Sequence, residues 1–335
     1  MIELISMVGQ LDPAENSRLQ TGDMKKFVHD CSCDGIETIF DGTENLGAKQ
    51  SDLVAGYHLI FYPDWLDFWN GDQSALDRKF GSPDIWKGFY LGSGRSSLVN
   101  QLHADLLRAE SLGVRYVVFH VSDVSIEEGY TYQWEHTDQE VIDAAAELIN
   151  LLLDGQGYSF EFLMENLHWP GFTFTRPELT GRLISRVNYP KKGIMLDVGH
   201  LMCTDMEIKD QADACRYVHR MLDEHGELCR YIRGVHLHQS VTGGYVKQSL
   251  KKQPVLKQDY YERFAESYGH IRRIDTHQPF DCSEVRRLVE RISPEYLVHE
   301  ISAGSLEEKK ELIKIQQNAL RGNVDYEKKF RKEKE

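Results

Sequence analysis

The sequence has no run of about 18 apolar residues, the length that a transmembrane helix requires. Its opening residues, MIELISMVGQ, also lack the basic segment and the following apolar segment of a secretory signal peptide. These two absences predict a soluble, cytoplasmic protein that has no membrane partner.

Cysteine is scarce, and glycine does not form a nucleotide-binding pattern. The six cysteines contain no C-x-x-C pair, and in a chain of 335 residues they do not make a disulfide framework, so we expect reduced thiols. The glycine-dense stretch LGSGRSS (91–97) matches neither the G-x-G-x-x-G fingerprint nor the Walker sequence. The sequence therefore does not indicate a dinucleotide-binding or P-loop protein.

Positive charge is in deficit. The chain has 39 Lys and Arg against 53 Asp and Glu, which gives a formal net charge of −14. Binding to nucleic acid or to anionic lipid depends on Lys and Arg contacts with phosphates, so this balance argues against both partners. It does not exclude a local basic groove.

Short β-rich runs alternate along the chain with longer amphipathic segments. The eight runs span 2–8, 35–40, 56–61, 115–121, 159–166, 193–199, 232–238 and 295–301. Helical spacing of apolar residues appears between them, as in 96–113, 138–155, 211–226 and 282–292. Thr137 and Glu140 are placed to form a capping box at the start of the second of these helices.

Strands that alternate with helices indicate a parallel sheet. Eight repeats favour a (β/α)8 TIM barrel over an open doubly wound sheet, and 41% apolar residues are enough to bury its core. We therefore predict one TIM-barrel domain over residues 1–335. Long loops follow strand 3 (61–92) and strand 7 (240–271), and both should lie over the face where the strands end.

Side chains that can bind a metal stand at the C-terminal ends of the predicted strands. They are His58, His120, Glu165, Asp197, His200, His236, Asp275, His277 and Glu300. In a barrel these ends meet at one face. So many carboxylates gathered away from water would repel one another unless cations lay among them. The pattern therefore predicts a metal site.

The donor atoms of this set are imidazole nitrogens and carboxylate oxygens, without a thiolate. Such donors suit Zn²⁺, Mn²⁺ or Fe²⁺, and nine ligands are enough for two or three ions. By strand alternation His238 points to the same side as His236, so we expect it to contact the substrate or to support a ligand. His299 should face away from Glu300.

The motifs VVFH, MEN, LDVGH, VHLH, DTH and HE follow one another along the chain. In them the sequence resembles the xylose isomerase-like TIM-barrel superfamily, and within it the endonuclease IV branch (AP endonuclease family 2), over roughly residues 35–301. The resemblance implies three zinc ions. One would be held by His58, His120 and Glu165, a second by Glu165, Asp197, His236 and Glu300, and a third by His200, Asp275 and His277.

The resemblance leaves two reaction types open. Isomerases and epimerases of the superfamily use one divalent ion on residues such as Glu165, Asp197, His236 and Glu300, and their two glutamates move protons at carbon. They usually lack the Asp275/His277 pair together with histidines such as His58 and His120. The complete set favours metal-assisted hydrolysis of a phosphodiester. We predict such a hydrolase, with Glu165 and Glu300 as catalytic residues, and keep a sugar or sugar-phosphate isomerase or epimerase as the alternative.

The substrate is indicated by the loop after strand 3. An abasic-site DNA endonuclease needs basic loops, whereas PDWLDFWNGD (63–72) is aromatic and acidic, so DNA is a lesser alternative. We predict a bulky small-molecule phosphodiester whose apolar part stacks on Trp65 or Trp69. Some members of the superfamily cut the nucleotide loop of cobamides, which makes a corrinoid one candidate.

Overall fold

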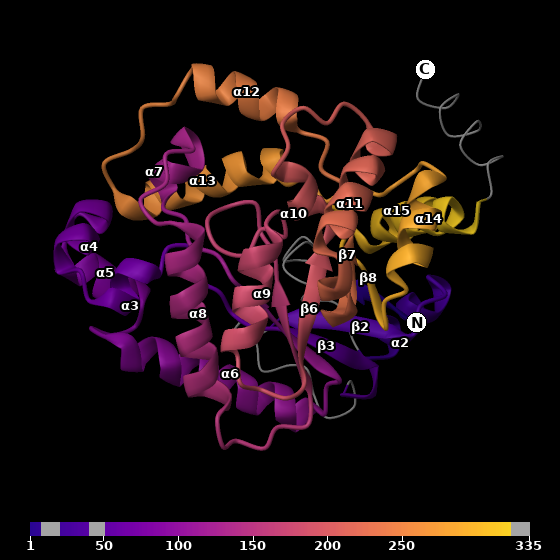
Figure 1. Ribbon diagram of the computed structural model, residues 1–335, viewed down its shortest axis with the longest axis horizontal. Coiled ribbons are helices and arrows are strands. Elements are labelled where there is room, and N and C mark those ends of the chain that lie inside the picture. Colours follow the sequence, from indigo (N-terminus) through magenta and orange to yellow (C-terminus); the bar gives the residue numbers. More distant parts are fainter. Residues whose placement is uncertain (8–20, 40–50, 323–335) are drawn as a thin grey trace.

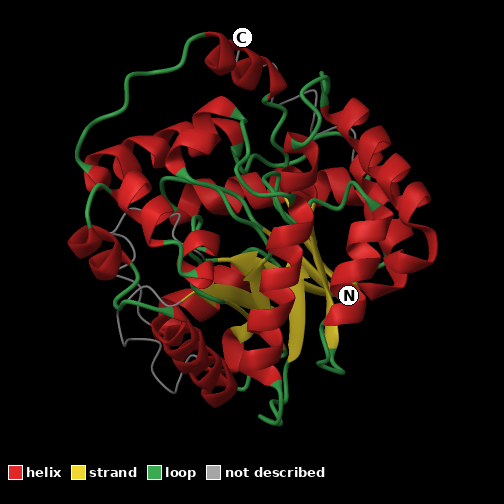
Figure 2. Cartoon of the chain, turned by 60° about the vertical axis from the view of Figure 1, so that its left-hand side comes forward, coloured by secondary structure: helices red, strands yellow, loops and turns green. Residues whose placement is uncertain are grey.

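The computed structural model describes residues 1–7, 21–39 and 51–322, and the structural statements below refer to these ranges. Eight parallel strands pair in sequence order, and β1 pairs with β8, so the sheet closes into a barrel (Figures 1 and 2). The strands are β1 (Ile2–Ser6), β2 (Gly35–Ile39), β3 (Val54–His58), β4 (Tyr116–His120), β5 (Glu161–Glu165), β6 (Lys192–Asp197), β7 (Ile232–Leu237) and β8 (Tyr296–His299).

Helices lie between the strands and cover the barrel from outside. The outer helices are α2 (Thr21–Asp30), α6 (Arg95–Leu112), α8 (Asp138–Leu153), α9 (Pro177–Arg186), α11 (Gln211–His225), α14 (Glu284–Ile292) and α15 (Leu306–Arg321). Short 3-10 helices span Ser51–Leu53 and Gly226–Tyr231. The predicted TIM-barrel fold is confirmed, and the predicted strands overlap the observed ones.

The interior of the barrel is apolar below and polar above. Leu4, Tyr116, Val118, Leu163, Met195, Tyr296 and Val298 form a buried inner cluster. Because alternate strand residues share a face, Val118 and His120 point to the same side, with His120 nearer the strand end. The apolar cluster therefore fills the barrel interior beneath the polar side chains at the C-terminal strand ends.

Further helices interrupt the segments that leave the C-terminal ends of the strands. These are α3 (Leu66–Asn70), α4 (Gln73–Phe80) and α5 (Pro83–Phe89) after β3, α7 (Ile126–Thr131) after β4, α10 (Val198–Cys203) after β6, and α12 (Gly243–Lys251) and α13 (Tyr260–Ile274) after β7. The two long segments predicted as loops are thus partly helical.

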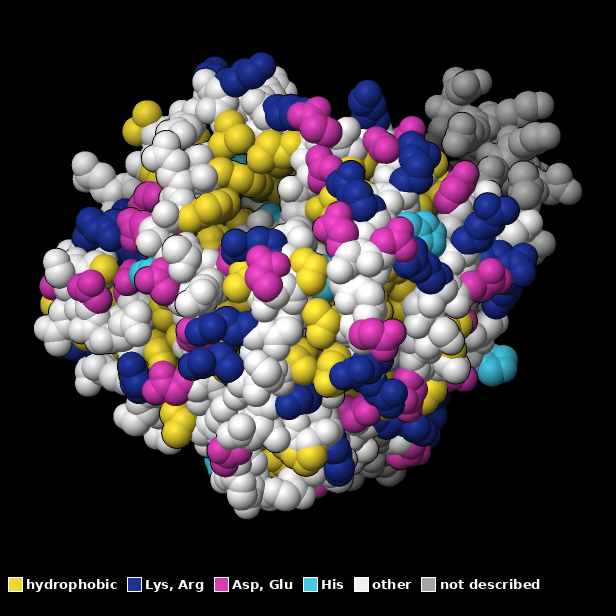
Figure 3. All heavy atoms as spheres, viewed as in Figure 1, with side chains coloured by type: hydrophobic (Ala, Val, Ile, Leu, Met, Phe, Trp, Pro, Cys, Tyr) yellow, Lys and Arg dark blue, Asp and Glu magenta, His cyan; other side chains and the backbone are white. Residues whose placement is uncertain are grey.

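These added helices pack on one another at one end of the barrel (Figure 1). Phe80 of α4 stacks on Tyr260 of α13, with ring centroids 4.3 Å apart. On the same helix, His270 stacks on Tyr130 of α7 at 4.2 Å. Figure 3 shows hydrophobic side chains gathered between α12 and α13. The segments after β3, β4 and β7 therefore form one cover beside the strand ends.

Three other sequence-based expectations concern local features. Thr137 and Glu140 form the capping box predicted for α8. All six cysteines are free thiols. Among the described helices, none is both long and apolar enough to cross a membrane.

Candidate metal centre

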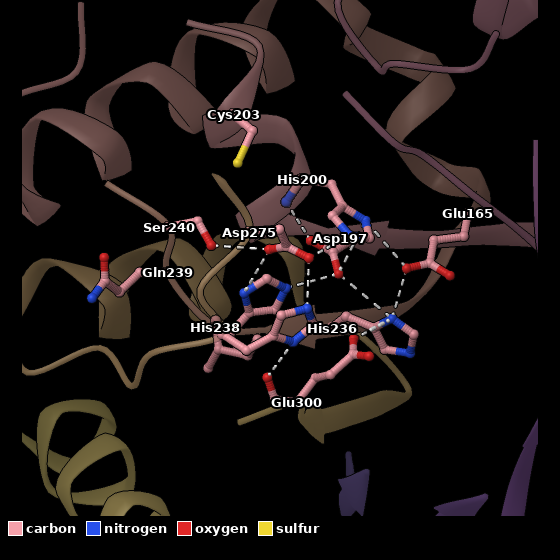
Figure 4. A network of polar contacts seen from close by, with 12 residues as sticks. Glu165, Asp197, His200, Cys203, His236, His238, Gln239, Ser240, Asp275 and Glu300 are labelled. Atoms are coloured by element: carbon pink, nitrogen blue, oxygen red, sulfur yellow. Dashed lines mark hydrogen bonds and ion pairs between the residues drawn. The ribbon is translucent and has the colours of Figure 1, made fainter. Parts of the chain in front are cut away.

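The nine residues predicted as ligands lie together at the C-terminal end of the barrel. They end or follow strands and short helices: His58, His120, Glu165 and Asp197 end β3 to β6, His236 lies in β7, His200 in α10, Glu300 follows β8, and Asp275 and His277 follow α13. Figure 4 shows most of them converging on one region. Their ligand atoms fall into three groups, each with all atoms within 4.8 Å of one another.

The first group joins β3, β4 and β5. His58 Nε2 lies 3.0 Å from His120 Nε2 and 3.2 Å from Glu165 Oε2. His120 Nε2 lies 3.0 Å from the same Glu165 oxygen. Three potential ligand atoms therefore face a common point.

The second group shares Glu165 with the first. His236 Nδ1 lies 2.9 Å from Glu165 Oε1 and 2.9 Å from Glu300 Oε2, and Asp197 Oδ2 lies 3.7 Å from it. Glu165 thus turns one carboxylate oxygen to each of two groups. This is the arrangement expected of a carboxylate that bridges two ions.

The third group is organised by Asp275. Its Oδ2 lies 3.1 Å from His200 Nε2 and 2.6 Å from His277 Nε2, and its Oδ1 accepts a hydrogen bond from Ser240 Oγ at 3.0 Å. His277 has a φ of 48°, a left-handed conformation that is uncommon for a residue with a side chain. Backbone strain of this kind is found mostly at functional sites.

Hydrogen bonds behind the groups determine which ring nitrogens can bind a metal. The Nδ1 atoms of three histidines each lie against a backbone carbonyl oxygen: His58 at 2.8 Å from Leu59, His200 at 3.0 Å from Asn166 and His277 at 3.0 Å from Glu300. A carbonyl oxygen only accepts, so the proton resides on Nδ1 and the lone pair on the inward Nε2. The donor set therefore fits divalent metal ions.

The charges of the groups point the same way. Burial acts to lower the pKa of His236, but Glu300, Glu37 and Glu165 outweigh it and hold that pKa well above its usual value. Burial acts to raise the pKa of Glu165, but His120 and His236 outweigh it and hold that pKa well below its usual value. The centre therefore favours ionised carboxylates and positive charge. These are the conditions under which a bound cation is stabilised.

The sequence also matches a known protein family. A family described as "Xylose isomerase-like TIM barrel" matches residues 88–319, which is more than half of the chain. The chain belongs to this family. Proteins of this family are enzymes and commonly bind divalent metal ions. A sequence search among curated proteins gives no significant match.

Solved structures show the same barrel at low sequence identity. A D-tagatose 3-epimerase-like protein has a TM-score of 0.52 at 16% identity, covering 97% of this chain and 100% of that chain. An L-ribulose 3-epimerase has a TM-score of 0.51 at 12% identity, covering 98% and 96%. A mannonate dehydratase from Streptococcus suis serotype 2 has a TM-score of 0.51 at 10% identity, covering 97% and 94%. At these identities the likeness shows the fold alone.

The sequence analysis missed Glu37, which contacts a residue of the second ligand group. It is fully buried in β2 and lies 3.1 Å from Nε2 of His236, the nitrogen that faces away from the ligand groups. The Tyr116 hydroxyl donates to Glu37 at 2.8 Å. A carboxylate behind a metal-binding histidine fixes its tautomer and strengthens it as a ligand. In the sequence, the only signal for Glu37 was its place in the strand-like alternation of the run GIETIF.

His238 lies within the third ligand group, and its two predicted roles, contact with substrate or support of a ligand, stay predictions. It is fully buried, and its Nε2 lies 3.0 Å from Asp197 Oδ2. Its ring stacks on that of His277 with centroids 4.0 Å apart. These contacts with Asp197 and His277 are compatible with a supporting role.

The two tryptophans predicted to stack on substrate are mostly buried. Trp69 is 1% exposed, and its Nε1 donates to Glu147 at 3.2 Å. Trp65 is 4% exposed, and its Nε1 donates to the Ser122 carbonyl oxygen at 2.8 Å. Both rings belong to the main buried cluster of the protein. Trp65 also lines the hollow beside Phe61, so its contact with substrate stays a prediction, whereas Trp69 does not line that hollow.

Phe61 is the aromatic side chain that remains open beside the ligand groups. It is 48% exposed, and its ring centroid lies 4.5 Å from that of His120 and 5.9 Å from that of His58. A small hollow adjoins it, lined mostly by apolar residues that include Trp65 and Phe119. An apolar surface thus borders the first ligand group.

Proposed function

We propose that this protein is a metal-dependent hydrolase of a small-molecule phosphodiester. The observation that carries the proposal is the position of Glu165, whose two oxygens face two separate ligand groups, with a third group beside them. We infer two or three ions, Zn²⁺ in the first place, with Mn²⁺ or Fe²⁺ as alternatives. Clustered divalent ions would polarise a phosphate and activate water for attack on it.

The chain's own residues would hold and orient the reacting groups. Glu165 and Glu300 keep His236 between them, each with an oxygen 2.9 Å from its Nδ1. Asp275 aligns His200 and His277 on the other side. The added helices α3–α5, α7, α12 and α13 would limit the access of water to the strand ends.

The surroundings support a substrate that is partly apolar. Phe61 and the hollow beside it offer a wall for a bulky apolar group, such as that of a corrinoid. The segment that includes α12 and α13 is locally basic within an acidic chain, which would favour an anionic substrate. Its basic residues are Lys247, Lys251, Lys252, Lys257, Arg263, Arg272 and Arg273, against Asp259, Glu262 and Glu266.

A sugar or sugar-phosphate epimerase is the second candidate. The second ligand group alone can hold one ion and places two glutamates, Glu165 and Glu300, on either side of His236. In that reaction the two glutamates would move protons at a substrate carbon. An abasic-site endonuclease ranks lower, because the chain has a formal net charge of −14 and the stretch PDWLDFWNGD after β3 is aromatic and acidic.

Variants of the outer groups separate the candidates. We would assay zinc-loaded and manganese-loaded protein with bis(p-nitrophenyl) phosphate, D-tagatose and abasic duplex DNA, and compare it with His58→Ala and His277→Ala. A phosphodiesterase should lose most turnover in both variants, since each loses a ligand of the first or third group. A one-ion epimerase should keep its activity in both. Site-specific incision of abasic DNA in preference to the small diester would favour the endonuclease.

A further inference from the structure

His168 lies beside the third ligand group but is not part of it. It follows β5 in the chain and is 7% exposed. Its ring centroid lies 5.9 Å from that of His200. The charged groups that act on it are His200 and Asp275, both members of the third group.

Neither ring nitrogen of His168 has a hydrogen-bond partner among the described residues. Three other buried histidines use both nitrogens, whereas His238 in the third group leaves its Nδ1 without a hydrogen bond. His225 pairs with Thr180 and Met221, His270 with Tyr245 and Gly129, and His299 with Glu3 and Gln316. Buried polar groups in native proteins are nearly always paired, so an unpaired one is expected to meet a ligand or water.

Two neighbouring side chains share this property. Within the described ranges, Trp169 Nε1 and the Tyr132 hydroxyl also have no hydrogen-bond partner. Tyr132 has a φ of 55°, a strained conformation for a bulky residue. The Trp169 ring lies beside that of His168, with centroids 4.3 Å apart, and Tyr132 packs against the cluster that contains Cys203 of α10.

Helix α13 places these side chains under one cover. Ile271 packs against the cluster that contains Trp169, and Ile274 belongs to the cluster against which Tyr132 packs. Residues three apart lie on the same face of a helix. The same cluster as Ile274 includes Cys203 of α10, the helix that carries His200. The cluster that contains Trp169 and the cluster against which Tyr132 packs therefore both border α13.

The three side chains can make hydrogen bonds without carrying a charge. No carboxylate pairs with the His168 imidazole among the described residues, and in its neutral form the ring offers one donor and one acceptor. Trp169 adds a donor, and Tyr132 adds a group that both donates and accepts. A hydroxyl-rich group satisfies such a set, whereas a phosphate would call for Lys or Arg.

We propose that His168, Trp169 and Tyr132 form a subsite for the neutral, hydroxyl-bearing part of the substrate, such as a sugar ring. The inference deepens the proposed function and rests on it for the position of the phosphate at the ligand groups. Phe61 borders the first group and His168 borders the third. The substrate would therefore lie across the centre with its apolar part toward Phe61 and its hydroxyl groups toward His168.

Binding of two simple ligands tests the subsite without requiring turnover. Calorimetry would compare inorganic phosphate with ribose 5-phosphate on the metal-loaded protein. Two or three neutral hydrogen bonds should make ribose 5-phosphate bind roughly 10- to 100-fold more tightly. In His168→Phe this advantage should largely disappear, while the affinity for phosphate and the metal content stay unchanged.

Stability and matched variants control for a structural role. His168→Phe removes no protein hydrogen bond, so its thermal midpoint should equal that of the natural protein. His225→Phe removes two hydrogen bonds and should lower the midpoint but keep the ribose advantage. Trp169→Phe should reduce the advantage independently, and His168→Asn should restore part of it because an amide also donates and accepts.

The outcomes of this test and of the function test are separable. Equal binding of the two ligands by the natural protein, or an unchanged advantage in His168→Phe and Trp169→Phe, would overturn the subsite. A ribose advantage that depends on His168, in a protein that hydrolyses no phosphodiester, would keep the subsite and reject the proposed hydrolase.

Discussion

Glu37 and His236 are in contact at 3.1 Å, both fully buried, although they are 199 residues apart in the chain. The contact holds the Nε2 proton of His236 toward Glu37 and turns Nδ1 toward Glu165 and Glu300. It therefore decides which nitrogen of His236 can bind a metal.

Glu37→Gln should weaken metal binding without removing a ligand. Loss of a carboxylate behind a metal-binding histidine typically lowers metal affinity by about 10- to 100-fold. Competition with a chromogenic chelator would measure the effect. Glu161→Gln is the matched control, because Glu161 pairs with Arg233 at 3.0 Å at the other end of β5 and should leave the metal affinity unchanged. Equal affinities in both variants would contradict this role of Glu37.

His277→Ala should remove one ion and leave the fold intact. His277 is held by Asp275 and by the Glu300 carbonyl oxygen, outside the apolar inner cluster of the barrel. Elemental analysis should therefore find one ion fewer per chain, and circular dichroism should be unchanged. If the metal content stays the same, the third group does not bind an ion. His29→Ala, at a side chain that is 91% exposed, is the control.

Much of the fold and of the ligand set could be predicted from the sequence for one physical reason. Parallel strands of a barrel bring their C-terminal ends to one face, so an ordered series of strand ends already places His58 beside His120 and Glu165. The resemblance in the motifs from VVFH to HE then divided the ligands into groups. The same three sets are observed as neighbours, with His238 as a further member of the third.

What could not be predicted depends on contacts between distant segments. Glu37 reads as an ordinary strand residue until His236 is placed next to it. The burial of Trp69 follows from helices that form within a segment expected to be a loop. In addition, Arg95, at the start of α6, packs over the Trp69 ring, with its guanidinium carbon 4.5 Å from the ring centroid. The unpaired nitrogens of His168 are also invisible in the sequence, because a missing partner is a property of the packed structure.

A buried ionic cluster joins the segments after β3 and β4 and predicts a dependence of stability on pH. Lys79 Nζ lies 2.6 Å from Asp67 and 3.1 Å from Asp64, and His136 Nε2 lies 3.1 Å from Asp67. Burial acts to raise the pKa of Asp67, but hydrogen bonds from His136 and Lys79 lower it to about 2. The folded protein thus binds this proton less readily than the unfolded chain does.

The sign of the effect follows from this lowered pKa. Asp67 contributes stability above the pKa of an unfolded aspartate, and the contribution is lost as the pH falls toward about 2. Asp67→Asn should therefore unfold at lower urea than the natural protein near about pH 7, and the gap should shrink below about pH 4. A gap that is constant with pH would show that Asp67 acts through packing. Asp84→Asn, at an exposed position of α5, is the control.

Phe61 and Trp69 should respond in opposite ways to substitution by alanine. Trp69 is buried, so Trp69→Ala should lower the free energy of unfolding by about 3–5 kcal/mol, as removal of large core side chains does. Phe61 is 48% exposed beside His58 and His120, so Phe61→Ala should change stability little but raise the KM for a phosphodiester with an apolar group. Urea unfolding and steady-state kinetics would be measured on both variants. The opposite result would be a raised KM in a stable Trp69→Ala protein, with Phe61→Ala unaffected. It would show that Trp69 stacks on the substrate, whose apolar part would then lie inside the segment after β3 rather than at the first ligand group.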